Sequence, residues 1–169
     1  MPSLLGNPSK PDFENDRSIP EANDSVEKNS MNAIDTNVFV YAFDEADPYK
    51  RTKAVALLDV LIKDRSKTLL FSQVAGELLA QLRRWEAKGK ISTEEVESNF
   101  NDVLRMFPFR RSSKRLFSLS FKLRSRYSLS HWDSMLVAAA IDAGVNVFYS
   151  EDMAPGTSYD GVTVVNPFS

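Results

Sequence analysis

The sequence contains no cysteine and only one histidine, His131, among its 169 residues. The absence of cysteine excludes disulfides, thiolate nucleophiles, iron–sulfur clusters and cysteine-ligated zinc. A single histidine also excludes a zinc site built from several histidines. No stretch approaches the ~20 consecutive apolar residues that span a membrane, and the first residues do not form a basic-then-apolar signal peptide. We therefore expect a cytoplasmic protein without a membrane anchor.

The length of 169 residues fits a single domain, but the composition is not uniform along the chain. Residues 1–30 carry a net charge of −3, are rich in Pro, Ser, Asn and Asp, and show no apolar periodicity. Such a segment cannot bury enough apolar surface to offset the entropy lost on ordering. The sequence therefore predicts a disordered N-terminal extension over residues 1–30 and one folded domain over residues 31–169.

From Met31 onward, short apolar segments alternate with segments in which apolar residues recur at helical spacing. The apolar segments predict buried strands over residues 33–34, 68–71, 146–149 and 162–165. The periodic segments predict helices over residues 38–43, 49–64, 73–88, 92–107, 113–126 and 131–143. Ser72 and Ser130 are expected to be N-caps of the helices that follow them. Short strands separated by helices indicate the α/β class, with a parallel sheet covered on both faces.

Four acidic residues stand at the ends of predicted strands or in the first turns of predicted helices: Asp35, Glu77, Asp133 and Asp152. Ligands of open parallel sheets bind beyond the carboxyl ends of the strands, so these side chains are expected at one rim. Carboxylates gathered there repel one another unless a cation lies among them. Ligand sets made only of oxygen select hard cations such as Mg²⁺ or Mn²⁺. Structural roles are the alternative, for example Asp133 as part of a helix cap and Asp152 as a turn residue.

The segments around these acids follow one another in a characteristic order: Ile34-Asp35-Thr36-Asn37-Val38, then Ser72-Gln73-Val74 with Glu77, then Trp132-Asp133-Ser134 through Ala140, then Tyr149-Ser150-Glu151-Asp152-Met153. Together they resemble the PIN-domain family, and most closely the VapC-type toxins of bacterial toxin–antitoxin pairs. The resemblance covers residues 31–168. One departure is Gly76, where the family often has a larger residue.

The resemblance implies a three-layer α/β/α fold with a central parallel sheet of four to five strands. It implies an Mg²⁺- or Mn²⁺-dependent endoribonuclease that hydrolyses RNA phosphodiester bonds, the toxin of a type II pair, with a small antitoxin partner and a homodimeric state. The catalytic and metal-binding acids of the family fall on Asp35, Glu77, Asp133 and Asp152. Its supporting polar groups fall on Thr36, Asn37 and Ser150. The alternative is a non-catalytic PIN-like module that binds RNA or protein.

Positive charge is concentrated between Arg83 and Arg126, where 12 basic residues accompany five acidic ones. A nuclease with an acidic site needs positive charge nearby to hold a polyanion. We therefore expect phosphate contacts from Arg110, Arg111, Lys114 and Arg115. A solvated helix face is the alternative. Phe107 and Phe109 are expected to pack in the core, and His131 to lie at the surface without a catalytic role.

Overall fold

The computed structural model describes residues 30–169, so nearly all of the predicted N-terminal extension lies outside the described residues. The strands are β1 (Asn32–Ile34), β2 (Thr68–Phe71), β3 (Phe109–Arg110), β4 (Val147–Tyr149), β5 (Ser158–Tyr159) and β6 (Val162–Val165). The helices are α1 (Thr36–Phe43), α2 (Pro48–Ile62), α3 (Ser72–Ala87), α4 (Thr93–Met106), α5 (Arg115–Tyr127) and α6 (His131–Asp142), with a 3₁₀ turn at Arg65–Lys67.

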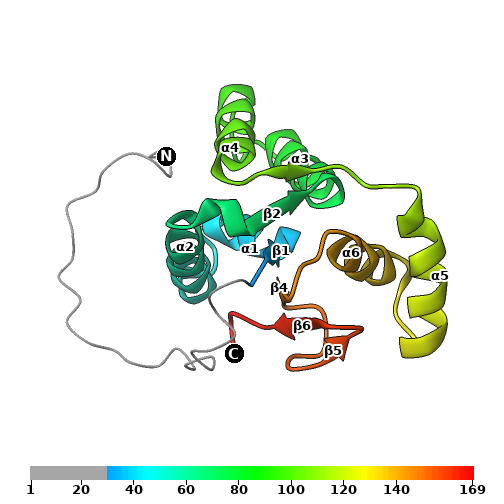
Figure 1. Cartoon of the computed structure of the whole chain (residues 1–169). Helices are drawn as coiled ribbons and strands as arrows, with labels where there is room; N and C mark the ends of the chain where they lie inside the picture. The colour runs from blue at the N-terminus through cyan, green and yellow to red at the C-terminus, as the bar shows by residue number, and fades with distance from the viewer. Residues whose placement is uncertain (1–29) are drawn as a thin grey trace, which may run out of the picture.

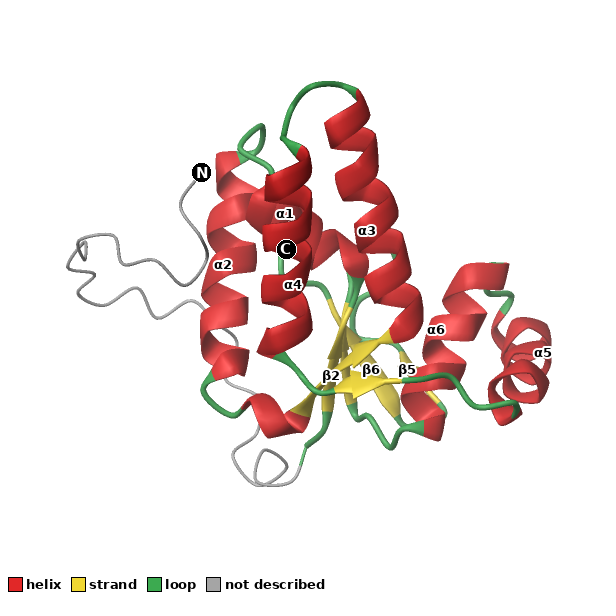
Figure 2. Ribbon diagram, turned by 90° about the horizontal axis from the view of Figure 1, so that it is seen from above, coloured by secondary structure: helices red, strands yellow, loops and turns green. Residues whose placement is uncertain are grey.

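The strands form one sheet in the order β3-β2-β1-β4-β6-β5. All neighbouring pairs are parallel except β5 with β6, which are antiparallel. Figure 1 shows α1 and α2 on one side of the sheet and α5 and α6 on the other. Figure 2 shows α3 and α4 side by side, extending away from the strands. The predicted α/β class with a central parallel sheet is confirmed, and β5 adds a short antiparallel strand at one edge.

The core lies between the sheet and the helices that flank it. Phe148 of β4 is completely buried, as is Ala33 beside it in β1. Buried side chains from both helical layers pack around this centre: Val38, Phe39, Val74, Leu78, Leu82, Leu123, Val137 and Ala140. Among the described residues, no helix is both long and apolar enough to cross a membrane.

Two of the helix starts test the predicted N-caps. Ser130 caps α6, because its hydroxyl accepts the backbone N–H of Asp133 at 3.1 Å. The prediction for Ser72 is wrong, since α3 begins at Ser72 itself and the cap position falls on Phe71, which has no capping side chain. Strand β2 ends at Phe71 and continues directly into α3, so no residue remains between them to act as a cap.

The parallel arrangement decides where the candidate site lies. Strands β1, β2 and β4 are in register and point the same way, so their carboxyl ends meet at one rim of the sheet. Asp35 follows β1 directly, α3 begins where β2 ends, and Ser150 follows β4. The backbone N–H of Asp35 donates to the carbonyl of Tyr149 at 2.9 Å, which joins the ends of β1 and β4.

Candidate active site

Asp35 is the buried centre of the candidate site, with only 6% of its surface exposed. It occupies the N-cap of α1, where its Oδ1 accepts the backbone N–H of Thr36 at 2.7 Å. Its Oδ2 accepts the hydroxyl of Ser150 at 2.6 Å and, more weakly, the side-chain amide of Asn37 at 3.4 Å. The positive end of the α1 dipole favours an anion at this position.

Burial nevertheless raises the pKa of Asp35 from its ordinary 3.8 to about 6, because a charged carboxylate loses water there. The hydrogen bonds from Ser150 and Thr36 act in the opposite direction and only partly offset the burial. The negative charges of Asp152 and Glu77 raise the pKa further. Asp35 is therefore an anion that the protein alone compensates incompletely, and a cation would stabilise its charged form.

Asn37 links Asp35 to Asp152. Its Nδ2 donates to Asp152 Oδ2 at 3.2 Å as well as to Asp35 Oδ2. Because both neighbours are acceptors, the amide nitrogen must point toward them and the orientation of the amide is fixed. The other amide atom, Asn37 Oδ1, is buried and has no hydrogen-bond partner within residues 30–169. Since the nitrogen faces both carboxylates, Asn37 can orient Asp35 and Asp152 relative to each other.

Glu77 joins the same group from the second turn of α3. Its Oε2 accepts the Thr36 hydroxyl at 2.8 Å, and its Oε1 accepts the Gln73 side-chain amide at 2.9 Å. Gln73 was not predicted as a site residue, although its position four residues before Glu77 on one helix face is a signal for such a contact. Both Glu77 oxygens are thus oriented by neighbouring side chains.

Asp133 has different contacts. Its Oδ2 accepts the Ser130 hydroxyl at 2.7 Å, so Ser130 and Asp133 are bonded to each other at the start of α6. Among residues 30–169, the hydrogen bonds that connect Asp35, Glu77 and Asp152 through Thr36 and Asn37 do not extend to Asp133. Within the described part of the chain, no three Asp, Glu or His side chains converge into a ready-made metal site.

The group nevertheless fits a hard cation that keeps part of its water shell. Asp35 and Asp152 offer carboxylate oxygens from two segments that lie at the rim and are linked by Asn37, and the Thr36 hydroxyl links Glu77 to the same group. Mg²⁺ and Mn²⁺ commonly bind through one or two carboxylates together with water. A bound ion of this kind supplies positive charge to a phosphate and lowers the pKa of a water molecule.

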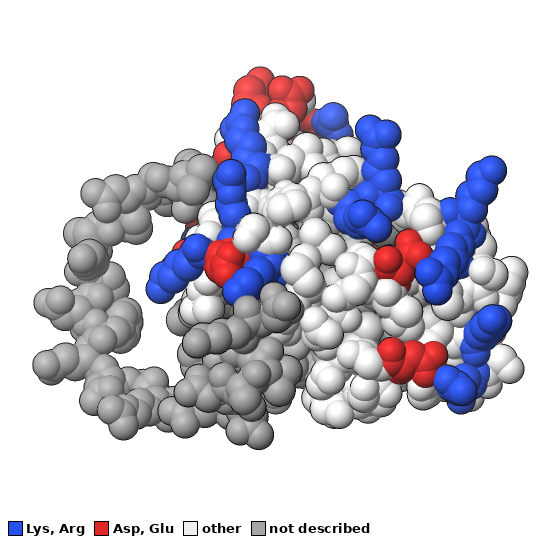
Figure 3. Space-filling view, viewed as in Figure 1, with Lys and Arg blue, Asp and Glu red and all other residues white. Residues whose placement is uncertain are grey.

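The predicted phosphate-binding residues surround the end of β3, which lies beside β2 at the edge of the sheet. Arg110, Arg111, Lys114 and Arg115 are all exposed. The Ser72 and Ser112 hydroxyl oxygens lie 3.2 Å apart, so this segment passes the start of α3, the helix that carries Glu77. Figure 3 shows basic side chains on the side where Figure 1 shows α5, with acidic groups among them, and further basic side chains elsewhere on the same face.

The aromatic residues of this region behave differently from one another. Phe107 is 3% exposed, as predicted for the core, but the prediction for Phe109 is wrong, because 48% of its surface is exposed. Phe109 belongs to the two-residue strand β3, which is the edge strand of the sheet within residues 30–169. His131 is exposed, which agrees with the predicted surface position. The centre of its ring lies 4.8 Å from the centre of the Trp132 ring.

Fold and site together define a class: a mostly parallel α/β domain with oxygen-only acidic side chains grouped at the carboxyl ends of its strands. The PIN domain family matches residues 33–154, and the chain belongs to this family. No curated protein matches the chain in sequence.

Solved structures support the fold assignment. The chain is similar to a toxin-antitoxin complex from Klebsiella pneumoniae, with 18% identity and a TM-score of 0.61 over 81% of this chain and 98% of that chain. It is similar to VapBC2 from Rickettsia felis bound to a promoter DNA fragment (16% identity, TM-score 0.59, 79% and 96% covered). It is also similar to Mycobacterium tuberculosis VapC20, a sarcin-ricin loop cleaving toxin (13% identity, TM-score 0.53, 72% and 90% covered). At these identities the likeness concerns the fold.

Proposed function

We propose that the protein is a divalent-metal-dependent endoribonuclease that acts as the toxin of a type II toxin–antitoxin pair in the cytoplasm. The observation that carries the proposal is the grouping of Asp35, Glu77 and Asp152 at the strand ends of a PIN domain. The raised pKa of Asp35 favours a cation at this place.

In this proposal Mg²⁺ or Mn²⁺ is held by Asp35 and Asp152, and Asn37 and Ser150 orient those two carboxylates. Glu77 acts from behind Thr36, through water in the ion's shell. Asp133 completes the site from the start of α6, in keeping with its place in the family motif. Its bond to Ser130 then has to open or be shared when the ion binds.

Cleavage of a single-stranded RNA tests the proposal. The full chain is expected to cut the RNA in Mg²⁺ or Mn²⁺ and not in chelator, and Asp35→Asn is expected to abolish cutting. Asp59→Asn is the matched control, because Asp59 is an exposed aspartate on α2 outside the site. Equal cleavage by the Asp35→Asn variant and the natural protein would contradict the assignment of Asp35.

A non-catalytic RNA- or protein-binding module is the second candidate. It is favoured by one observation: both Asp35 oxygens already accept hydrogen bonds within the protein. RNA binding without cleavage, at any tested concentration of Mn²⁺ or Mg²⁺, would favour this candidate over the nuclease.

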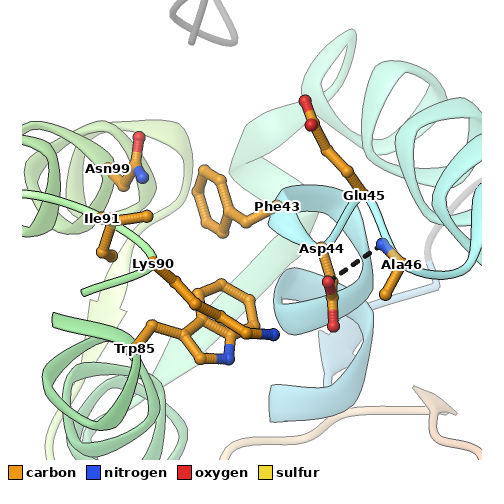
Figure 4. A pocket seen from close by; sticks show the side chains of 8 residues that line it. All are labelled: Phe43, Asp44, Glu45, Ala46, Trp85, Lys90, Ile91 and Asn99. Atoms are coloured by element: carbon orange, nitrogen blue, oxygen red, sulfur yellow. Dashed lines mark hydrogen bonds between the residues drawn. The ribbon is translucent and has the colours of Figure 1, made fainter. Parts of the chain in front are cut away.

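We further propose that a small antitoxin covers part of the helical surface, and the structure offers a place for one of its apolar side chains. A hollow of about 250 Å³ lies between α1, α3 and α4, with Phe43, Trp85 and Ile91 on its walls and charged groups around them (Figure 4). Ala46→Arg at its rim is expected to weaken binding of the product of a small adjacent reading frame, whereas Asp59→Asn is not.

A homodimer is part of the same proposal. Phe117 and Phe121 stand one turn apart on α5 and are 55% and 75% exposed, which leaves an apolar strip that a second copy would cover. Sedimentation of the Phe121→Glu variant should show a shift toward monomer if α5 forms the interface.

A further inference from the structure

Beside the candidate site, Tyr41, Lys50 and Glu151 form a closed set of hydrogen bonds that we call the Glu151 clamp. Glu151 Oε2 accepts the Tyr41 hydroxyl at 2.7 Å, and Oε1 accepts the Lys50 ammonium. The same ammonium donates to the Tyr41 oxygen at 2.9 Å. Only 26% of the Lys50 side chain and 25% of the Glu151 side chain are exposed, so water competes weakly for these bonds.

Two aromatic rings support the clamp from its other side. The Lys50 ammonium lies 4.4 Å from the centre of the Tyr41 ring and 5.8 Å from that of Phe168. The Tyr41 and Phe168 rings meet edge to face with their centres 5.0 Å apart. Phe168 is 8% exposed, so these rings are packed and hold Lys50 by cation–π attraction as well as by hydrogen bonds.

The clamp is connected to the site through neighbouring residues in the chain. Glu151 lies between Ser150, which donates to Asp35, and Asp152, which accepts from Asn37. The backbone N–H of Asp152 also donates to the Ser150 hydroxyl at 3.2 Å. A displacement of Glu151 therefore moves the two residues that flank it, and both of these contact the Asp35–Asn37 group.

Helix α1 sets the register of this segment. Asn37 and Tyr41 are four residues apart and lie on the same face of α1, where Asn37 bonds Asp152 and Tyr41 bonds Glu151. Asp35 is the N-cap of the same helix. One rigid helix thus contacts two consecutive residues of the loop after β4 and holds them at a fixed distance from Asp35.

The clamp also keeps a further acid out of the site. Both Glu151 oxygens are used by Tyr41 and Lys50, so its carboxylate is turned away from Asp35 and its charge is balanced by Lys50. Without Lys50, this uncompensated charge would add to the repulsion among the carboxylates next to it.

We propose that Tyr41 and Lys50 are positioning residues that hold Glu151, fix Ser150 and Asp152 against Asp35, and thereby set the affinity of the site for its divalent cation. This inference rests on the proposed function, because it concerns the same metal site. In this inference Tyr41 and Lys50 act through Glu151, which both of them contact, and not as ligands of the ion.

Calorimetric titration of the full chain with Mn²⁺ alone tests the inference. Tyr41→Phe keeps the ring against Phe168 and removes only the hydroxyl, and Lys50→Met keeps the chain length and removes the ammonium. Changes in residues that orient metal ligands typically weaken metal binding about 10–100-fold. Since the clamp acts through Asp152, we expect each variant to raise the Kd for Mn²⁺ by about tenfold.

The matched control is Lys53→Met, which removes an ammonium from the same helix at a position whose aromatic contact is Tyr49, outside the clamp. Its Kd for Mn²⁺ should stay within about twofold of the natural protein. The Tyr41→Phe/Lys50→Met double variant should raise the Kd for Mn²⁺ by less than the product of the two single-variant increases, because both side chains act on one carboxylate. Melting in chelator should be nearly unchanged for Tyr41→Phe, which separates positioning from general loss of structure.

Each result is decisive. If the natural protein binds Mn²⁺ and the two clamp variants bind it equally well, the clamp inference is wrong and the proposed function stands. If the natural protein binds no Mn²⁺, the metal-dependent function fails and the clamp inference fails with it. Three results together would support the inference. Both clamp variants would bind Mn²⁺ more weakly, their RNA cleavage would be restored at saturating Mn²⁺, and the Lys53→Met variant would be unaffected.

Discussion

Replacing Asp35 by asparagine is expected to stabilise the metal-free protein at neutral pH, although it removes the buried carboxylate of the candidate site. The reason is the pKa of Asp35, which is about 6 in the folded protein against 3.8 ordinarily. One pKa unit corresponds to about 1.4 kcal/mol, so the ionised side chain destabilises the fold by about 3 kcal/mol above pH 6. Asparagine has nearly the same shape and carries no charge.

The direction in which stability changes with pH follows from proton binding to Asp35. Between about pH 4 and pH 6 the unfolded chain has already released the Asp35 proton while the folded protein retains it, so stability falls as pH rises through this window. Below the window both states are protonated and the penalty vanishes. Asparagine does not titrate, so the stability difference between the variant and the natural protein should grow from pH 4 to pH 6 and then level off.

Hydrogen bonding reduces the expected gain. The asparagine oxygen can still accept the Thr36 N–H, but the new amide group faces the Ser150 hydroxyl, which must turn to accept rather than donate. The new group also faces the Asn37 amide, a donor at 3.4 Å from the present oxygen. We subtract about 1 kcal/mol for this mismatch. The net gain at pH 7.5 should be about 1–2 kcal/mol, or a few degrees in Tm for a domain of this size.

Thermal unfolding of both proteins in chelator, from pH 4 to pH 8, measures this gain. Other carboxyl groups, such as Asp160 and Glu86, have lowered pKa values, so the stability that they contribute to the fold is lost in acid. These groups are common to both proteins, so their effect cancels in the difference. Adding Mn²⁺ at about 100 times its Kd should stabilise the natural protein by about 2.7 kcal/mol and leave the variant unchanged. A stability difference that stays constant from pH 4 to pH 8 would refute the reasoning.

Three further predictions concern other parts of the chain. Neutralising Arg110, Arg111, Lys114 and Arg115 together should weaken the salt dependence of RNA binding. The slope of the logarithm of the RNA binding constant against log salt should fall by roughly 0.7–0.9 for each lost phosphate contact. An unchanged slope would mean that these residues form a solvated face. Gly76→Ala should stabilise α3 by roughly 0.5–1 kcal/mol in urea unfolding, because nothing lies within 4 Å of the added Cβ. Ser92→Ala should lower the free energy of unfolding by roughly 1 kcal/mol in the same assay, since Ser92 and Glu95 form a complete capping box at the start of α4. An unchanged free energy of unfolding would show that the cap is not needed.

The sheet could be predicted where apolar residues form continuous runs. The strand over residues 162–165 has the bounds that the sequence predicts, because valine at three of its four positions is typical of a buried parallel strand. Strands β3 and β5 contain two residues each, too few for any periodicity. The β5–β6 hairpin did have a sequence signal, the dipeptide Asp160-Gly161, because Asp-Gly favours a type I′ turn. Such a turn requires positive φ at both residues, and both have it in the structure.

The site could be predicted as a set of residues at one rim, but not as a network of contacts. Asp35, Glu77 and Asp152 lie at one rim because the preceding strands are parallel, which the alternation of strands and helices indicates. Their hydrogen bonds depend on side-chain rotamers, so the bridging amide of Asn37 was predicted only as a supporting group. For the same reason, the hydrogen bond from the Ser130 hydroxyl to Asp133 is visible only in the structure.

The choice between two adjacent acids shows most clearly what the sequence leaves open. Glu151 and Asp152 are equally acidic neighbours, and composition cannot say which one faces the site. In the structure Glu151 faces Tyr41 and Lys50, more than 100 residues earlier in the chain, and Asp152 faces Asn37. Asn37 and Tyr41 lie one turn apart on α1, so each of the two acids has its own partner on that helix. Tyr41 on α1 and Lys50 on α2 hold the Glu151 carboxylate, whereas Asn37 holds that of Asp152. In the proposed site, Asp152 is therefore the acid that is available to a metal ion.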